Sequence, residues 1–176
     1  ENYDWVAARL DTDSFMDLMI NEIYIANNDP YNMQFYQIPP DGKWVQIYQD
    51  LDIAFYSFDT LAMRMGDTAG SDLFNALLSY KPWRDKFIER FAWALENIYN
   101  TERVTAAVNK AADLIRSEMA ADHARWSDLP TFEEWEGGVA RMLTFAKNRP
   151  AAMVDHLKRH FSLTQAQIDL LEAAIR

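Results

Sequence analysis

Two short acidic motifs place carboxylate and amide side chains where a metal–nucleotide site could form. Residues 27–32 (NNDPYN) follow an apolar helical stretch, and residues 50–55 (DLDIAF) follow an expected strand. Carboxylate and amide oxygens are hard ligands of the kind that Mg²⁺ takes beside nucleotide phosphates. If the hairpin expected between the two motifs folds back, they meet, and together they indicate the catalytic half of a phosphotransferase.

Each motif also has a purely structural interpretation. In kinases a loop Asp orients the attacking hydroxyl and a following Asn holds a metal, which Asp29 and Asn32 could do here. Asn-Asn-Asp-Pro is equally typical of a helix end with an Asx turn, and composition alone favours that interpretation. Asp50 and Asp52 fall on one side of the strand end, where they could chelate Mg²⁺ or simply end the strand. Their joint order (helix, acidic loop, hairpin, acidic strand end) matches the loop order of protein kinases and strengthens the site interpretation.

The flanking sequence predicts the elements that position these motifs. Residues 11–14 offer N-cap oxygens, and the apolar residues that follow recur at helical spacing. These apolar residues are Phe15, Leu18, Met19, Ile23 and Ala26. The helix should end near residue 28, because Asp29 precedes Pro30 and is disfavoured in the α region. Residues 33–38 and 43–48 are predicted to form a hairpin, with its turn at residues 39–42.

The remainder of the chain is predicted to be helical from Ser71 onward, whereas residues 57–70 give no prediction. Two apolar stripes are expected. One comprises Phe87, Phe91, Leu95 and Ile98, and the other Val104, Val108, Ala111, Ile115 and Met119. The expected fold class is therefore mainly α with one β-hairpin, as a single domain over residues 1–176.

The C-terminal helices carry their own start and stop signals. Thr131 and Glu134 predict a capping box for a helix that runs to about Asn148. Pro150 is expected to begin or kink the next helix, and Thr164 to cap a short helix that ends at Ile175. The acidic residues at 133, 134 and 136 are interpreted as a charged helix N-terminus.

Histidines and tryptophans offer weaker signals. His156 and His160 lie four residues apart, a spacing that could hold a metal, but neighbouring Lys158 and Arg159 favour a solvated helix face. Five tryptophans are expected mainly in the core, with a carbohydrate-binding platform as the alternative. They are Trp5, Trp83, Trp93, Trp126 and Trp135.

Composition excludes several classes of protein. The chain has 176 residues, of which 49% are hydrophobic, enough for the core of one domain. A net charge of −10 argues against general binding to nucleic acid or anionic membranes. The absence of cysteine excludes a disulfide scaffold, a thiolate zinc site and a Cys nucleophile. No apolar run reaches about eighteen residues, so no membrane-spanning segment is expected.

The chain resembles the CotH (spore coat protein H) kinase family from about residue 10 to 163. The segments that carry the resemblance are 13–17 (DSFMD), 21–24 (NEIY), 28–29, 32–36 (NMQFY), 41–44 (DGKW), 50–55, 87–91 (FIERF), 125–126, 149–150 and 160–163. The resemblance implies the C-terminal lobe of an atypical protein-kinase-like fold. It also implies a protein kinase that uses ATP and Mg²⁺ to phosphorylate Ser or Thr of partner proteins at a cell surface, in a spore coat or outside the cell.

Carried over position by position, the resemblance assigns roles to four residues. Asp29 corresponds to the catalytic-loop aspartate, and Asn32 to the asparagine that holds metal and cofactor. Asp50 corresponds to the metal aspartate of the kinase DFG motif and also contacts the cofactor. Asp52 occupies the second Asp position of the family and supports the metal site.

The sequence departs from the family pattern in three places. The loop after Asp29 is about two residues shorter, which is expected to leave Asn32 short of the metal. Tyr56 replaces a glycine. About ten residues precede the first matched helix, so the N-terminal lobe that covers the nucleotide is expected to be absent and phosphoryl transfer by this chain alone negligible. The alternative function is a non-catalytic interaction domain, attached to a cell surface or scaffold, that keeps a kinase-like fold.

Overall fold

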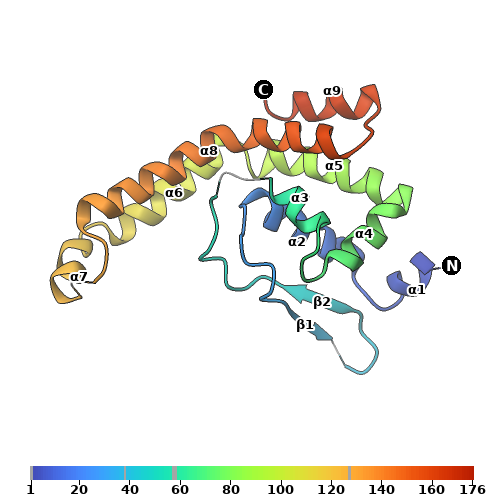
Figure 1. Ribbon diagram of the computed structural model, residues 1–176, viewed down its shortest axis with the longest axis horizontal. Coiled ribbons are helices and arrows are strands. Elements are labelled where there is room, and N and C mark those ends of the chain that lie inside the picture. The colour runs from blue at the N-terminus through green and yellow to red at the C-terminus, as the bar shows by residue number, and fades with distance from the viewer. Residues whose placement is uncertain (1, 38, 57–58, 127) are drawn as a thin grey trace.

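The computed structural model describes residues 2–37, 39–56, 59–126 and 128–176. Its elements are α1 (Asn2–Ala7), α2 (Thr12–Tyr24), β1 (Gln34–Gln37), β2 (Trp44–Ile47), α3 (Thr60–Met65), α4 (Ser71–Ser79), α5 (Lys81–Asn97), α6 (Thr101–Ile115), α7 (Met119–Arg125), α8 (Phe132–His160) and α9 (Gln165–Ala173). In the described residues this is the expected class, mainly helical with one antiparallel hairpin (Figure 1).

Helices α2 and α5 form the centre of the main core. The Asp11 side chain caps α2 by accepting hydrogen bonds from the N–H groups of Asp13 and Ser14, as the sequence predicts. On α5 the ring of Phe87 is fully buried and contacts four other rings at centroid distances of 5.6–6.2 Å. The four are Phe74, Trp83, Phe91 and Phe161. This ring cluster joins α4 and α5 to the segment after α8, and α2 packs against α5 in the same core. The core therefore supports the loop that follows α2.

The hairpin is anchored to the start of α2. Strands β1 and β2 pair with Gln34 opposite Ile47 and Gln37 opposite Trp44, within the predicted strands. The Trp44 N–H donates to the Arg9 carbonyl at 2.7 Å, and the Asp11 N–H donates to the Trp44 carbonyl at 2.9 Å. Because an antiparallel hairpin returns the chain to its starting point, the loops before β1 and after β2 lie at the same end.

Helix α8 runs through Pro150 to His160, so the helix predicted to end near Asn148 does not end there and no new helix begins at Pro150. A proline lacks the N–H that would bond the carbonyl four residues earlier, here that of Ala146. The hydroxyl of Thr101, at the start of α6, donates to that Ala146 carbonyl at 3.3 Å. A neighbouring helix therefore supplies the missing hydrogen bond, and packing against α6 and α9 keeps α8 continuous (Figure 1).

The structure adds one helix that was not predicted and corrects the buried face of another. Residues 60–65, left without a prediction, form α3, which Asp59 caps by accepting from the Ala62 N–H at 3.0 Å. On α6 the buried residues are Val108 and Ala112 rather than Ala111, and Ile115 is exposed. These buried residues form a small second cluster with Val139 of α8, so they face the neighbouring helix. The capping boxes at Thr131 and Thr164 are confirmed.

The tryptophans mostly lie at the surface, contrary to expectation. Of the five considered, Trp83 is buried at 2% exposure, whereas Trp5, Trp93 and Trp126 are exposed. An arginine guanidinium lies over each exposed ring, at 4.2 Å for Trp5 and Trp93 and 5.1 Å for Trp126. Cation–π contact explains how these rings are accommodated outside the core.

His156 and His160 do not lie on a solvated face, contrary to expectation. His156 Nδ1 lies 3.2 Å from Asp59 Oδ1, and His160 Nε2 lies 2.8 Å from Asp59 Oδ2. Arg159 Nη1 lies 2.9 Å from the same Asp59 Oδ2. The end of α8 is thus attached to the cap of α3 through one carboxylate.

Acidification is expected to destabilise the fold through this Asp59 cluster. Burial lowers the pKa of His156, so the unfolded chain binds more protons just below pH 6.5 and stability falls as the pH falls through that window. Burial opposes ionisation of Asp59, but hydrogen bonds from His160 and the Ala62 N–H lower its pKa overall. Its contribution is therefore present above its ordinary pKa of about 3.9 and is lost below it.

Urea unfolding of the wild type and of Asp59→Asn tests the contribution of the Asp59 carboxylate. The stability difference between the two proteins should be largest near neutral pH and shrink as the pH falls below about 4. A difference that stays constant across this range would show that the charge of Asp59 contributes nothing.

Candidate phosphotransfer site

The two acidic loops lie side by side, as expected from the hairpin. The Asn28 N–H donates to the Ile53 carbonyl at 2.8 Å, and the Phe55 N–H donates to the Ile25 carbonyl at 2.7 Å. These two backbone bonds join the loop after α2 to the loop after β2. Strand β2 ends at Ile47, so it is this pairing, rather than alternation along the strand, that places Asp50 and Asp52.

Asn32 connects the two loops at their side chains. Its Nδ2 donates to Asp29 Oδ2 at 2.8 Å and to Asp50 Oδ2 at 2.7 Å. The shortened loop, which was expected to leave Asn32 short of the metal, forms a tight turn in which the Tyr31 N–H donates to Asp29 Oδ1 at 3.0 Å. The structure therefore brings Asp29, Asn32 and Asp50 into one cluster.

These three residues, together with the neighbouring Asp52, form an acidic cluster that is rich in negative charge. A hydrogen bond with Asp52 and the charge of that carboxylate raise the pKa of Asp50, with a smaller contribution from the charge of Asp29. All three carboxylates are at least partly open to solvent. Like charges held this close favour binding of a proton or a cation.

The backbone of both loops adopts rare conformations. The described non-glycine residues with positive φ are Ala26 (55°), Asp50 (52°) and Phe55 (65°), and all three lie in these loops. Such conformations are costly for residues with a Cβ and persist where the surroundings enforce them, often at functional sites. For Asp50, the left-handed conformation accompanies the turn that brings its carboxylate to Asn32.

A buried ion pair between α2 and α3 supports the Asp29 loop. Arg64 of α3 donates to Glu22 Oε2 of α2 at 2.7 Å, and Asn27 Nδ2 donates to the same oxygen at 2.8 Å. The Asn27 side-chain oxygen in turn accepts from the Asp29 N–H at 3.0 Å. Burial raises the pKa of Glu22, while Arg64 and Asn27 oppose that rise. A chain of hydrogen bonds therefore runs from α3 through α2 to Asp29.

The turn at Asn27 is the Asx turn that the sequence offered as the structural interpretation of this motif. Glu22 and Arg64 were not predicted from the sequence, although one signal was available. Glu22 lies between Met19 and Ile23 on the apolar face of α2, and a charged residue in that position requires a buried partner. The partner, Arg64, is 42 residues away and could not be identified from spacing.

Arg149 of α8 contacts the C-terminal end of α2. Its guanidinium donates to the carbonyls of Ile23 at 2.5 Å and Tyr24 at 2.8 Å, and to Thr60 Oγ1 at 2.9 Å. The side chain is buried, and burial lowers its pKa to about 10. The last carbonyls of α2 thus receive donors from α8, immediately before the chain turns into the Asp29 loop.

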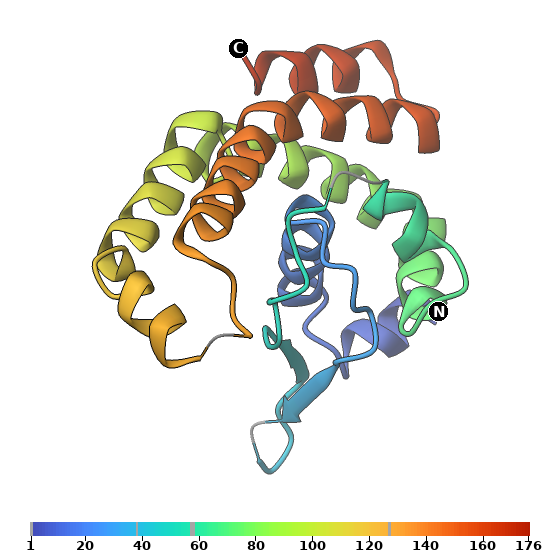
Figure 2. The ribbon, with the colours of Figure 1, turned by 60° about the vertical axis from the view of Figure 1, so that its left-hand side comes forward.

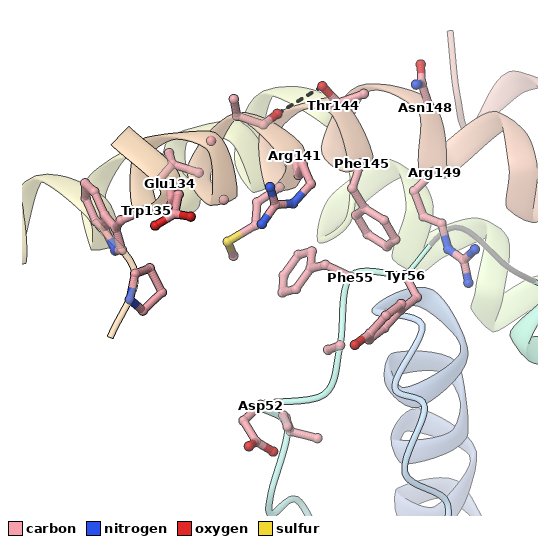
Figure 3. A pocket seen from close by; sticks show the side chains of 18 of the residues that line it. Asp52, Phe55, Tyr56, Glu134, Trp135, Arg141, Thr144, Phe145, Asn148 and Arg149 are labelled. Atoms are coloured by element: carbon pink, nitrogen blue, oxygen red, sulfur yellow. Dashed lines mark hydrogen bonds between the residues drawn. The ribbon is translucent and has the colours of Figure 1, made fainter. Parts of the chain in front are cut away.

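A cleft adjoins the acidic cluster. It lies between residues 51–56 and α8, which lines it from Glu134 to His156, and it has a volume of about 1180 Å³ (Figure 3). Asp52 lies at its edge, so the cluster and the cleft share a residue. Figure 2 shows the segment after β2 on the side of the molecule that faces α8, where the ring of Phe55 contacts that of Phe145.

The oxygen donors of the cluster fit a divalent cation. Within the described ranges, no three His, Cys, Asp or Glu side chains form a ready metal-binding group. The carboxylates of Asp50 and Asp52 and the amide of Asn32 are nevertheless hard ligands, and a cation there would offset the repulsion that raises the pKa of Asp50. Holding the cation would require the Asn32 amide to turn its oxygen toward it.

Comparison with known proteins gives one match. A family model described as CotH kinase protein matches residues 1–153. No curated protein and no solved structure matches the chain significantly. In the part of the chain that the structure describes, no helix combines the length and hydrophobicity that crossing a membrane requires.

Proposed function

This chain belongs to the CotH kinase family, and we propose that its two acidic loops form the catalytic and metal-holding edge of a protein kinase in the intact protein. The reaction would transfer the γ-phosphoryl group of ATP to a Ser or Thr hydroxyl of a partner protein. The observation that carries the proposal is the Asn32 bridge between the Asp29 and Asp50 carboxylates. The family's association with spore coats supports a partner in a coat or at a cell surface.

Each side chain has a distinct role in this proposal. Asp29, held by Asn27 and Asn32, would orient the acceptor hydroxyl and accept its proton as the oxygen forms a bond to the γ-phosphorus and the bond to the ADP oxygen breaks. Asp50 and Asn32 would hold Mg²⁺, with Asp52 as a supporting carboxylate. When bound, Mg²⁺ supplies neutralisation of the phosphate charge.

Binding of ATP in the presence of Mg²⁺ tests the proposal. Asp50→Ala in the intact protein is expected to weaken Mg²⁺-dependent ATP binding by about tenfold or more, since it removes a charged ligand. The unfolding temperature should not fall, because the exposed Asp50 carboxylate is repelled by Asp52 and Asp29. Isothermal titration calorimetry and thermal unfolding supply the two measurements.

Asp155→Ala is the matched control, because Asp155 is also an exposed carboxylate but lies on α8 outside both loops. Its ATP affinity should equal that of the wild type. If the wild-type intact protein shows no Mg²⁺-dependent ATP binding, the non-catalytic interaction domain becomes the better description.

A further inference from the structure

The cleft beside the acidic cluster has one apolar wall and one cationic feature. Phe55, Phe145 and Met142 contribute apolar surface to its lining, and Trp135 lies toward one end. Phe55 and Phe145 contact each other edge to face, with ring centroids 5.0 Å apart. At about 1180 Å³ the cleft is larger than most small-molecule sites, which span about 300–1,000 Å³. Its size and open shape suit an extended segment of polypeptide.

Arg141 provides the cation. It is an exposed residue of α8 whose side chain reaches into the cleft (Figure 3). Among the described residues its guanidinium has no hydrogen-bond or ion-pair partner. An arginine fork without a protein partner is suited to bind a carboxylate through two parallel hydrogen bonds.

The other charged residues of the cleft are already engaged. Glu134 Oε2 accepts from the backbone N–H and the hydroxyl of Thr131, both at 2.8 Å. Arg149 donates to α2 and α3, and His156 faces Asp59. Asp52 belongs to the acidic cluster, and Glu134 keeps its negative charge because the hydrogen bonds from Thr131 lower its pKa. Arg141 therefore supplies the positive charge, without a partner among the described residues, that a ligand in the remainder of the cleft would meet.

The backbone beside Arg141 also keeps the cleft open. Gly137 and Gly138 lie one turn before it in α8, although glycine weakens a helix interior. A Cβ at Gly138 would come within 3.6 Å of an Arg141 nitrogen, and one at Gly137 within 3.8 Å. Both contacts are ordinary, so the two glycines are not required by the packing of Arg141. Their effect is to leave space beside the guanidinium.

We propose that this cleft binds the acceptor segment of the protein substrate and that Arg141 selects segments with a carboxylate side chain near the acceptor hydroxyl. The inference rests on the proposed kinase function, which places the hydroxyl at Asp29. The shared residue Asp52 makes the cleft continuous with the acidic cluster, so one extended segment reaches both. The apolar wall receives an apolar side chain of the same segment.

Peptide binding tests the inference without phosphoryl transfer. Three labelled synthetic peptides share one serine and one phenylalanine and differ only in flanking residues, which are Asp, Asn or Lys. In fluorescence anisotropy the wild-type protein should bind the Asp peptide most tightly. Arg141→Glu should weaken that binding by about tenfold or more, since an Arg–carboxylate pair becomes a like-charge pair. The same variant should bind the Lys peptide more tightly than the wild type does.

Lys147→Glu is the matched control. Lys147 is an exposed cation on the same helix but does not line the cleft, so its reversal changes the net charge equally. Equal losses in the two variants would overturn the proposal, because the effect would then come from net charge. Wild-type binding without preference among the peptides would overturn it too, as would displacement of the Asp peptide by ATP without Mg²⁺.

The two proposals can fail separately. A positional-scanning peptide library phosphorylated by the intact protein without preference for Asp or Glu would overturn the acceptor inference and leave the kinase function standing. Arg141-dependent binding of the Asp peptide, in a protein that neither binds Mg²⁺–ATP nor phosphorylates any peptide, would support the cleft as an acidic-segment site and overturn the kinase function.

Discussion

Asp29→Asn is expected to lower phosphoryl transfer by the intact protein about 10²–10⁴-fold, the usual contribution of a positioned acid–base group. An asparagine keeps the size of the side chain and can still accept from the Tyr31 N–H, as Asp29 does at 3.0 Å. It cannot accept the proton of the attacking hydroxyl. The loss should therefore appear in kcat, measured as ³²P incorporation into a Ser-containing protein substrate.

Because asparagine has nearly the same shape as aspartate, the Asp29→Asn variant tests the carboxylate of Asp29 rather than the size of its side chain. The amide at position 29 can no longer accept from Asn32 Nδ2, but Asn32 keeps its 2.7 Å hydrogen bond to Asp50. ATP binding in the presence of Mg²⁺ should therefore change less than kcat. Asp155→Asn, on exposed α8 surface, should retain wild-type kcat. Full ³²P incorporation by Asp29→Asn would remove Asp29 from the catalytic role and leave it as a turn residue.

Local sequence signals were sufficient for the elements that frame the site. The helix from Thr12 has a capping Asp and apolar residues at regular helical spacing. The hairpin has strands that contain residues favouring β-structure, joined by a turn that contains proline. Both properties depend on neighbours in the chain. For this reason the approach of the Asp29 and Asp50 loops, a consequence of the hairpin, could also be predicted.

Features that depend on distant partners could not be predicted in this way. Pro150 was expected to begin or kink a helix, and the Thr101 hydroxyl that compensates for its missing N–H lies 45 residues before the Ala146 carbonyl that it satisfies. The same holds for the pairing of His156 and His160 with Asp59, and for the Glu22–Arg64 pair. Glu22, on the apolar face of α2, marked a tertiary contact without identifying its partner, whereas nothing in the spacing of the two histidines indicated Asp59.

Substitution of Arg149 is expected to have the largest effect on stability. It lies on the buried stripe of α8, between Phe145 and Met153, where its charge is unfavourable unless it serves the fold. A pKa lowered to about 10 still leaves it protonated at neutral pH, so the guanidinium keeps its charge among the buried groups that it contacts. Those groups are the carbonyls of Ile23 and Tyr24 and the hydroxyl of Thr60.

Arg149→Met is therefore expected to lower the free energy of unfolding by about 2–3 kcal/mol, because buried carbonyls that lose their donor cost about 1–3 kcal/mol each and the relief of burying a charge offsets part of that. Arg149→Lys should fall between the two proteins, since an ammonium cannot reproduce the planar fork. Arg159→Met removes an exposed ion pair to Asp59 and should cost less than about 1 kcal/mol. Urea unfolding monitored by circular dichroism gives all three values.

Because the carbonyls lie immediately before the Asp29 loop, Arg149→Met should also weaken Mg²⁺-dependent ATP binding at temperatures below its unfolding transition, whereas Arg159→Met should not. A methionine variant as stable as the wild type would mean that water replaces the guanidinium and that α2 does not need α8 to end where it does.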